Sequence, residues 1–84
     1  MAGDELPEGG TIETAIVILT SDPGDGVNQE YRHIGRLFGV RLSGWYPVGQ
    51  WLIRRDGRTY DRIDVQVGQR VWQVYFDITS FMPE

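Results

Sequence analysis

Residues 48–78 read VGQWLIRRDGRTYDRIDVQVGQRVWQVYFDI, and this stretch decides the fold. It holds two turn signals, Asp-Gly at 56–57 and Gly-Gln at 68–69, each set between runs rich in β-branched and aromatic residues. Asp-Gly suits a two-residue type I′ turn, and a leading glycine suits a type II′ turn. The sequence therefore predicts a three-stranded antiparallel meander over about 46–79.

The two turns also set the register of the three strands. The first turn places Trp51 opposite Arg62 and Val48 opposite Val65, and the second places Tyr75 opposite Arg62. In these registers one face collects most of the large apolar side chains, which a shift by one residue would scatter over both faces. The predicted core face comprises Val48, Leu52, Ile63, Val65, Val67, Trp72, Val74, Phe76 and Ile78.

An N-terminal strand is predicted at 11–20, because this run is β-branched and aliphatic and lacks Gly and Pro. Both of its alternating faces are apolar, as in strands that are covered on both sides. The covering layer is expected to come from the rest of the chain or from a second subunit. Residues 21–26 combine Ser, Asp, Pro and Gly and are predicted to form a turn.

The segment 28–42 fits two patterns. In the first pattern Tyr31, Ile34 and Leu37 follow helical spacing and Asn28 is a candidate N-cap, although two glycines weaken such a helix. In the second, Ile34, Phe38, Val40 and Leu42 share one face of a strand. We predict a short helix or turn near 28–36, followed by a strand at about 37–42.

These elements fit one small domain at residues 11–84, because domains below about 50 residues rarely fold alone. The expected fold class is mainly β, with α+β as the variant. The architecture is either a compact SH3-like or OB-like barrel or a sheet covered by a helix.

The composition excludes several functional classes. The 84 residues carry 12 acidic and 8 basic side chains, a net charge of −4, and every basic residue is an arginine. Cysteine is absent, so no disulfide, zinc-thiolate site or cysteine nucleophile can form. No apolar run is long enough for a signal peptide or a membrane span, which leads us to expect a cytoplasmic protein with no membrane contact. Residues 1–10 are acidic and poor in large apolar side chains, and they are predicted to be a disordered tail.

The second face of the predicted meander carries aromatic residues next to arginines. Its middle row is Trp51–Arg62–Tyr75, and this composition is typical of the residues that dominate protein interfaces. The alternative is a cross-strand packing cluster that is either solvated or covered by residues 28–42. The predicted binding residues are Trp51, Tyr60, Arg62 and Tyr75, with Arg55 and Arg58 at the rim.

The leading functional hypothesis is a non-catalytic protein–protein interaction module, such as an adaptor or a small inhibitor, with a protein partner. A homodimer through the second face of the first strand is a variant. A single-stranded nucleic-acid-binding small barrel using the same residues is the main alternative, which the net negative charge disfavours.

A third hypothesis is a small enzyme or ligand-binding dimer that uses His33, the only histidine, although no nucleophile motif accompanies it. Asp64 and Asp77 share a face at roughly 14 Å, too far apart for a glycosidase pair, and Asp61 points to the other side. Asp22 and Asp25 lack a third ligand at a calcium-loop spacing. The sequence therefore predicts no catalytic residue, no metal site and no cofactor.

Overall fold

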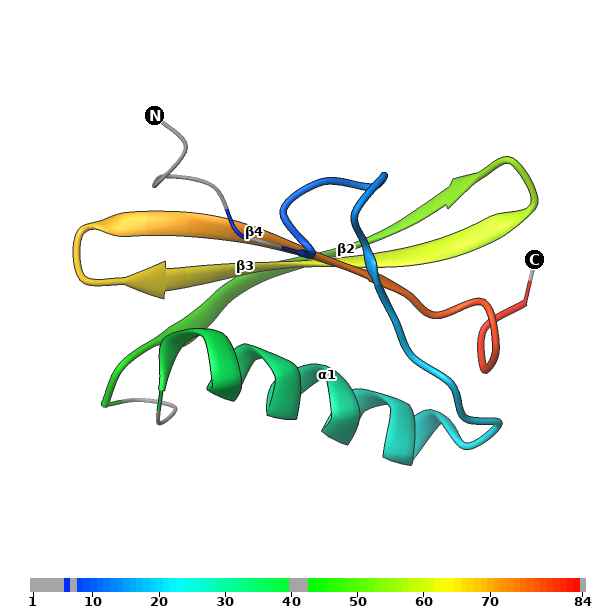
Figure 1. The fold of residues 1–84 in the computed structure, drawn as a ribbon, viewed down its shortest axis with the longest axis horizontal. Helices are drawn as coiled ribbons and strands as arrows, with labels where there is room; N and C mark the ends of the chain where they lie inside the picture. The colour runs from blue at the N-terminus through cyan, green and yellow to red at the C-terminus, as the bar shows by residue number, and fades with distance from the viewer. Residues whose placement is uncertain (1–5, 7, 40–42, 84) are drawn as a thin grey trace.

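A computed structural model describes residues 6, 8–39 and 43–83. Within these residues, one sheet with strand order β1-β4-β3-β2 is covered on one face by one helix (Figure 1). Of the two predicted architectures, the described residues form the helix-covered sheet, and the domain is mainly β with one helix, as predicted. The elements are β1 (Ile16–Val17), α1 (Pro23–Phe38), β2 (Tyr46–Arg55), β3 (Arg58–Val67) and β4 (Arg70–Asp77).

The two predicted hairpins are confirmed. Asp56 and Gly57 both have positive φ, 53° and 76°, as a type I′ turn requires. Gly68 has a φ of 61° at the leading position of the second turn. Between β3 and β4 the predicted register is kept throughout, with Arg62 opposite Tyr75.

Counted back from the hairpin turn, the predicted register between β2 and β3 is correct from Arg55 to Gly49. Before Gly49 a β-bulge shifts the pairing, so that Pro47 rather than Val48 lies opposite Val65. The predicted pairing of Val48 with Val65 is therefore wrong. Proline has no N–H to donate to a ladder, and such residues are tolerated at bulges and on edge strands such as β2.

The predicted strand at 11–20 is also wrong in length, because β1 comprises only Ile16 and Val17, paired in parallel with Phe76 and Asp77 of β4. Before β1, the Thr11 and Thr14 side chains and backbones hydrogen-bond to each other. Such local bonds offer the backbone an alternative to a strand ladder.

Only one side of this N-terminal segment is covered. Ile16 and Ile18 are buried, whereas Val17 is 54% exposed and Leu19 is 76% exposed. Cover on both sides was expected, and the described residues supply it on one.

The helix is longer than predicted and begins earlier. Asp22 is the N-cap, where Oδ1 accepts a hydrogen bond from the N–H of Gly24 (3.1 Å), and Pro23 occupies the first helical position. The predictions of a turn at 21–26 and of Asn28 as N-cap are therefore wrong. So is the strand predicted at 37–42, because α1 continues to Phe38; residues 40–42 lie outside the described residues.

Two glycines in α1 have opposite surroundings, and they predict opposite effects of alanine. A Cβ at Gly26 would collide with the ring of Phe81, whereas a Cβ at Gly35 would meet nothing within 4 Å. We expect Gly26→Ala to lower the free energy of unfolding by roughly 1–3 kcal/mol through overpacking. Gly35→Ala is expected to raise it by up to about 1 kcal/mol, because alanine favours helix. Urea denaturation followed by tryptophan fluorescence measures both, and equal effects would contradict the packing of Phe81 on α1.

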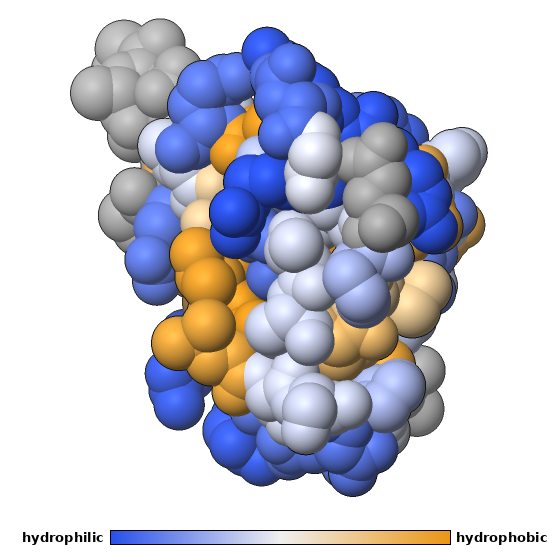
Figure 2. All heavy atoms as spheres, turned by 90° about the vertical axis from the view of Figure 1, so that its right-hand side faces the viewer, coloured by the Kyte–Doolittle hydropathy of each residue, from blue (hydrophilic) through white to orange (hydrophobic). Residues whose placement is uncertain are grey.

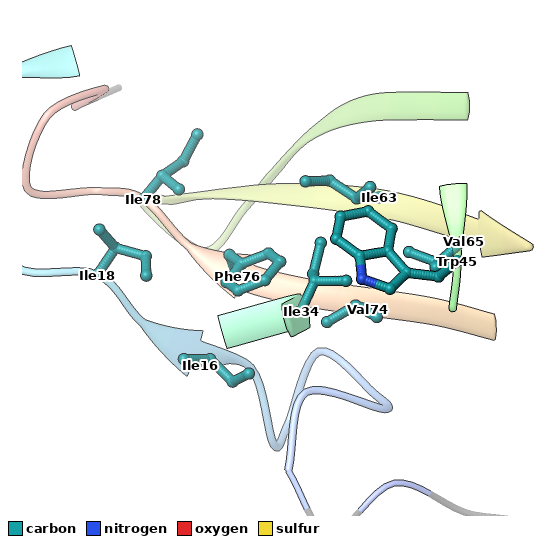
Figure 3. Close-up of a cluster of buried hydrophobic side chains, with 9 residues drawn as sticks. All are labelled: Ile16, Ile18, Ile34, Trp45, Ile63, Val65, Val74, Phe76 and Ile78. Atoms are coloured by element: carbon teal, nitrogen blue, oxygen red, sulfur yellow. The ribbon is translucent and has the colours of Figure 1, made fainter. Parts of the chain in front are cut away.

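The core lies between α1 and the sheet (Figure 3). Trp45 closes one end: it stacks on Tyr31 with a ring separation of 6.0 Å, and its Nε1–H donates to the carbonyl oxygen of Gly39 (2.7 Å). The indole thus ties the end of α1 to the start of β2. The buried apolar residues are Ile16, Ile18, Ile34, Trp45, Ile63, Val65, Val74, Phe76 and Ile78.

Two members of the predicted core face are not in the core. Val48 and Leu52 are about half exposed (50% and 51%), while Val67 and Trp72 are partly buried. Both misplaced residues belong to β2, an edge strand, whereas the buried side chains of the hairpins come from β3 and β4.

Part of the predicted N-terminal tail contacts the domain. Leu6 packs against the core, and Gly9 is buried, with its carbonyl oxygen accepting a hydrogen bond from the N–H of Tyr75 (2.6 Å). These described residues are not free of the sheet; residues 1–5 and 7 lie outside the described part of the chain.

Candidate binding face

The six predicted binding residues share the sheet face that α1 does not cover, here called the outer face. Trp51, Arg62 and Tyr75 lie opposite one another on β2, β3 and β4, as predicted. Tyr60 belongs to the next row, and Arg55 pairs with Arg58 at the end of the first hairpin. The structure thus brings the predicted residues together; that they bind a partner remains a prediction.

A stack of three groups forms the centre of the outer face. The Trp51 ring lies over Gly49, whose missing Cβ would come within 2.5 Å of Cη2. The Arg62 guanidinium lies over the indole, 4.2 Å from the ring centroid, and its Nε donates to Oδ1 of Asp64 (3.1 Å). Trp51 nevertheless keeps 47% of its surface exposed. The indole is therefore held in one orientation and remains accessible.

The other two arginines of this face are also paired. Arg58 Nε donates to Oδ2 of the buried Asp77 (2.6 Å), and Arg55 Nη1 lies 3.4 Å from a carboxylate oxygen of Glu13. Burial acts to raise the pKa of Asp77, but hydrogen bonds from Arg58 and Thr79 outweigh it and hold that pKa below its usual range. Among the described residues, the three arginines of the outer face therefore each have a negative partner.

His33 lies far from this cluster in the architecture, on α1 across the sheet. Its half-buried ring contacts Phe76 with a centroid separation of 6.3 Å. Burial, together with the charges of Arg36 and Arg32, lowers the pKa of His33, and the opposing effect of Glu8 is smaller. In the described part of the chain, no three His, Asp or Glu side chains are grouped as metal ligands.

The structure also contains an acid pair that the sequence did not predict. Glu30 of α1 and Asp61 of β3 are only 1% and 3% exposed, and their side chains are hydrogen-bonded to each other. Burial, that hydrogen bond and the charge of Asp61 raise the pKa of Glu30 to about 9. The predicted register already placed Asp61 on the core side of the sheet. Its pairing with Glu30 could be recognised only from the observed position of α1, in which Glu30 lies one turn before the buried Ile34.

These features define a two-layer domain of one helix on a mixed sheet, with an exposed aromatic–arginine cluster on the free face. The one helix that the described residues form is not long and apolar enough to cross a membrane. No protein-family model matches the chain, and no curated protein or solved structure matches it either.

Proposed function

We propose that this domain is a non-catalytic protein-binding module, an adaptor or small inhibitor, whose binding residues centre on Trp51 and Arg62. The observation that carries the proposal is the stack of Trp51 on Gly49 and under Arg62. Tryptophan and arginine dominate the energetics of many protein interfaces. An anchor that is already held in place loses little conformational freedom when a partner binds.

The charge pairing on the outer face favours a protein over a nucleic acid as the partner. Binding to a phosphate backbone depends on cations that are available to replace its counterions. Here Arg58 and Arg62 each donate to a carboxylate of their own sheet, and Arg55 faces Glu13. A protein surface requires no positive field and can accept these paired groups at the rim of an interface.

Affinity capture with the intact protein tests the proposal. A partner retained by the wild type should be lost with Trp51→Ala and with Arg62→Ala, by roughly 30-fold or more in affinity if these residues are dominant contacts. Arg32→Ala provides the matched control, because Arg32 is an exposed arginine on α1, away from the outer face. Circular dichroism would establish that all three variants are folded.

Two outcomes would count against this function. If the same proteins are captured by the wild type and by both outer-face variants, the proposed face is wrong. If a mixed-sequence single-stranded oligonucleotide instead shifts the NMR signals of Trp51 and Tyr75 in a salt-dependent way, the nucleic-acid hypothesis replaces it.

A further inference from the structure

A groove of about 390 Å³ lies between the first half of α1, the helix side of β2 and residues 78–82. Its walls are mainly apolar and include Val27, Leu52 and Phe81, of which Val27 and Leu52 are 42% and 51% exposed. Figure 2 views the end of the molecule where α1 begins and shows hydrophobic surface there between hydrophilic residues. This groove lies on the helix side of the sheet, so what it binds is independent of the proposed function.

The buried acid pair lines this groove together with Gln50. Asp61 Oδ2 accepts a hydrogen bond from Nε2 of Gln50 (2.8 Å), whereas Oε2 of Glu30 has no hydrogen-bond partner among the described residues. None of the ion pairs between described residues includes Glu30 or Asp61. An acceptor without a donor and an acid pair without a cation are both unusual for groups this deeply buried.

We propose that this groove binds a primary ammonium group carried on an apolar stem, with the ammonium at Glu30 and Asp61 and the stem along the apolar walls. An ammonium group is a compact cation with three N–H donors and no acceptor. It therefore supplies the positive charge that the acid pair lacks and, once Glu30 has released its proton to the solvent, an N–H donor for Oε2 of Glu30. The apolar stem covers surface that is otherwise exposed at Leu52 and Val27.

Other cations fit these residues less well. A guanidinium has five donors, and the apolar walls would leave several of them without acceptors. A divalent ion such as Ca²⁺ takes six or more oxygen ligands, and no group of three metal-ligating side chains occurs in the described residues. The chain contains no lysine, so none of its own side chains supplies an ammonium group, and the ligand we propose is a free alkylamine or a lysine side chain of another molecule.

Three probes of equal stem length test the proposal by NMR titration of the full chain. Hexylammonium should shift the signals of Val27, Leu52 and Met82, which line the groove. Hexan-1-ol lacks the charge, and hexyltrimethylammonium lacks the N–H donors, so both should bind at least about tenfold more weakly. Equal affinity of either control and hexylammonium would overturn the proposal.

Substitution of the acid tests the same point from the protein side. Asp61→Asn keeps an acceptor for Gln50 but removes the negative charge, and it should weaken hexylammonium binding at least about tenfold. Asp56→Asn is the matched control, because Asp56 is highly exposed at the hairpin turn, and it should leave the affinity unchanged. If Asp61→Asn binds like the wild type, the acid pair is not the site; if that variant does not fold, the three-probe comparison on the wild type decides alone.

A lysine-containing tripeptide with blocked termini distinguishes the two sources of the ligand. If it shifts the same groove signals as hexylammonium, a lysine side chain of a partner is the occupant. If only hexylammonium does so, the groove takes free alkylamines. If neither compound shifts these signals, the proposal is wrong, whatever the outer face binds.

Discussion

We expect the wild-type protein to lose stability as the pH rises from about 7 to 9, and we expect Glu30→Gln to abolish this loss. In the folded protein the Glu30 carboxyl is 1% exposed and its pKa is raised to about 9, first by burial and then by Asp61. In the unfolded chain its pKa returns to the ordinary value of a glutamate, 4.5. Between these two values the folded state holds a proton that the unfolded state does not, so stability falls as the pH rises.

The expected size of this effect is large for a domain of this length. One bound proton corresponds to about 1.4 kcal/mol per pH unit, and because Glu30 is already half ionised at pH 9, the loss between pH 7 and pH 9 is roughly 2 kcal/mol. A shift of this size should lower the melting temperature of the wild type by roughly 8–16 °C. Glutamine has nearly the shape of the protonated acid and can donate to Asp61, but it cannot ionise. Glu30→Gln should therefore keep its pH 7 stability up to pH 9.

The pH window was chosen to separate this effect from two others. The pKa of His33 is lowered in the fold, so its contribution to stability is lost as the pH falls through its titration range below about pH 7. The pKa of Asp77 is also lowered, and its contribution is lost only in acid. Thermal unfolding from pH 7 to pH 9.5 therefore reports mainly on Glu30.

A matched control is available on the surface. Glu13→Gln changes the same chemical group at a side chain that is 70% exposed, and its melting temperature should fall with pH as in the wild type. Asp61→Asn should give a weaker pH dependence than the wild type, because it removes the neighbour that adds to the raised pKa of Glu30. Parallel curves for Glu30→Gln and the wild type would contradict a protonated Glu30.

The two hairpins could be predicted because short-range chemistry determines them. Asp56 and Gly57 each adopt positive φ, and that conformation favours these residue types wherever the turn occurs. The turn then fixes the register, and the register places Trp51, Arg62 and Tyr75 in one row. For the same reason the candidate face could be assembled from the sequence, although its exposure could not.

The course of α1 could not be predicted, because local preference and tertiary packing point in opposite directions. Pro23 and Gly24 favour a turn, and Gly26 disfavours a helix interior. In the fold, however, Phe81 packs on Gly26 from the far end of the chain and leaves no room for a side chain. Without α1 in place, Glu30 could not be assigned to Asp61, so the groove could not be foreseen.

The orientation of Trp51 and the charge pairing on the outer face also depend on contacts that no local sequence pattern indicates. Nothing in the sequence indicates that the missing Cβ of Gly49 makes the surface on which Trp51 lies. The sequence predicts Arg55 and Arg58 at the rim of this face, but it does not show that Arg58 is bound to Asp77 of β4. The charge of the face is therefore a product of the sheet and not of the hairpin alone.

Ile18→Ala and Leu19→Ala, at adjacent positions, should have very different effects on the free energy of unfolding. Ile18 is fully buried, and its loss should cost about 2–5 kcal/mol through lost burial and a cavity beneath α1. Leu19 is 76% exposed, so truncating it should change the free energy of unfolding by less than about 0.5 kcal/mol. Chemical denaturation of both variants at low protein concentration measures the difference.

The same pair decides whether the second side of the N-terminal segment is covered by another copy of the chain. If Val17 and Leu19 form a dimer contact, Leu19→Ala will also be destabilising, and the melting temperature of the wild type will rise with protein concentration. If the segment is covered only by α1 and the sheet, Leu19→Ala stays neutral at every concentration. Similar losses for both variants in a protein that sediments as a monomer would contradict the one-sided burial, since Leu19 would then need a partner within its own chain.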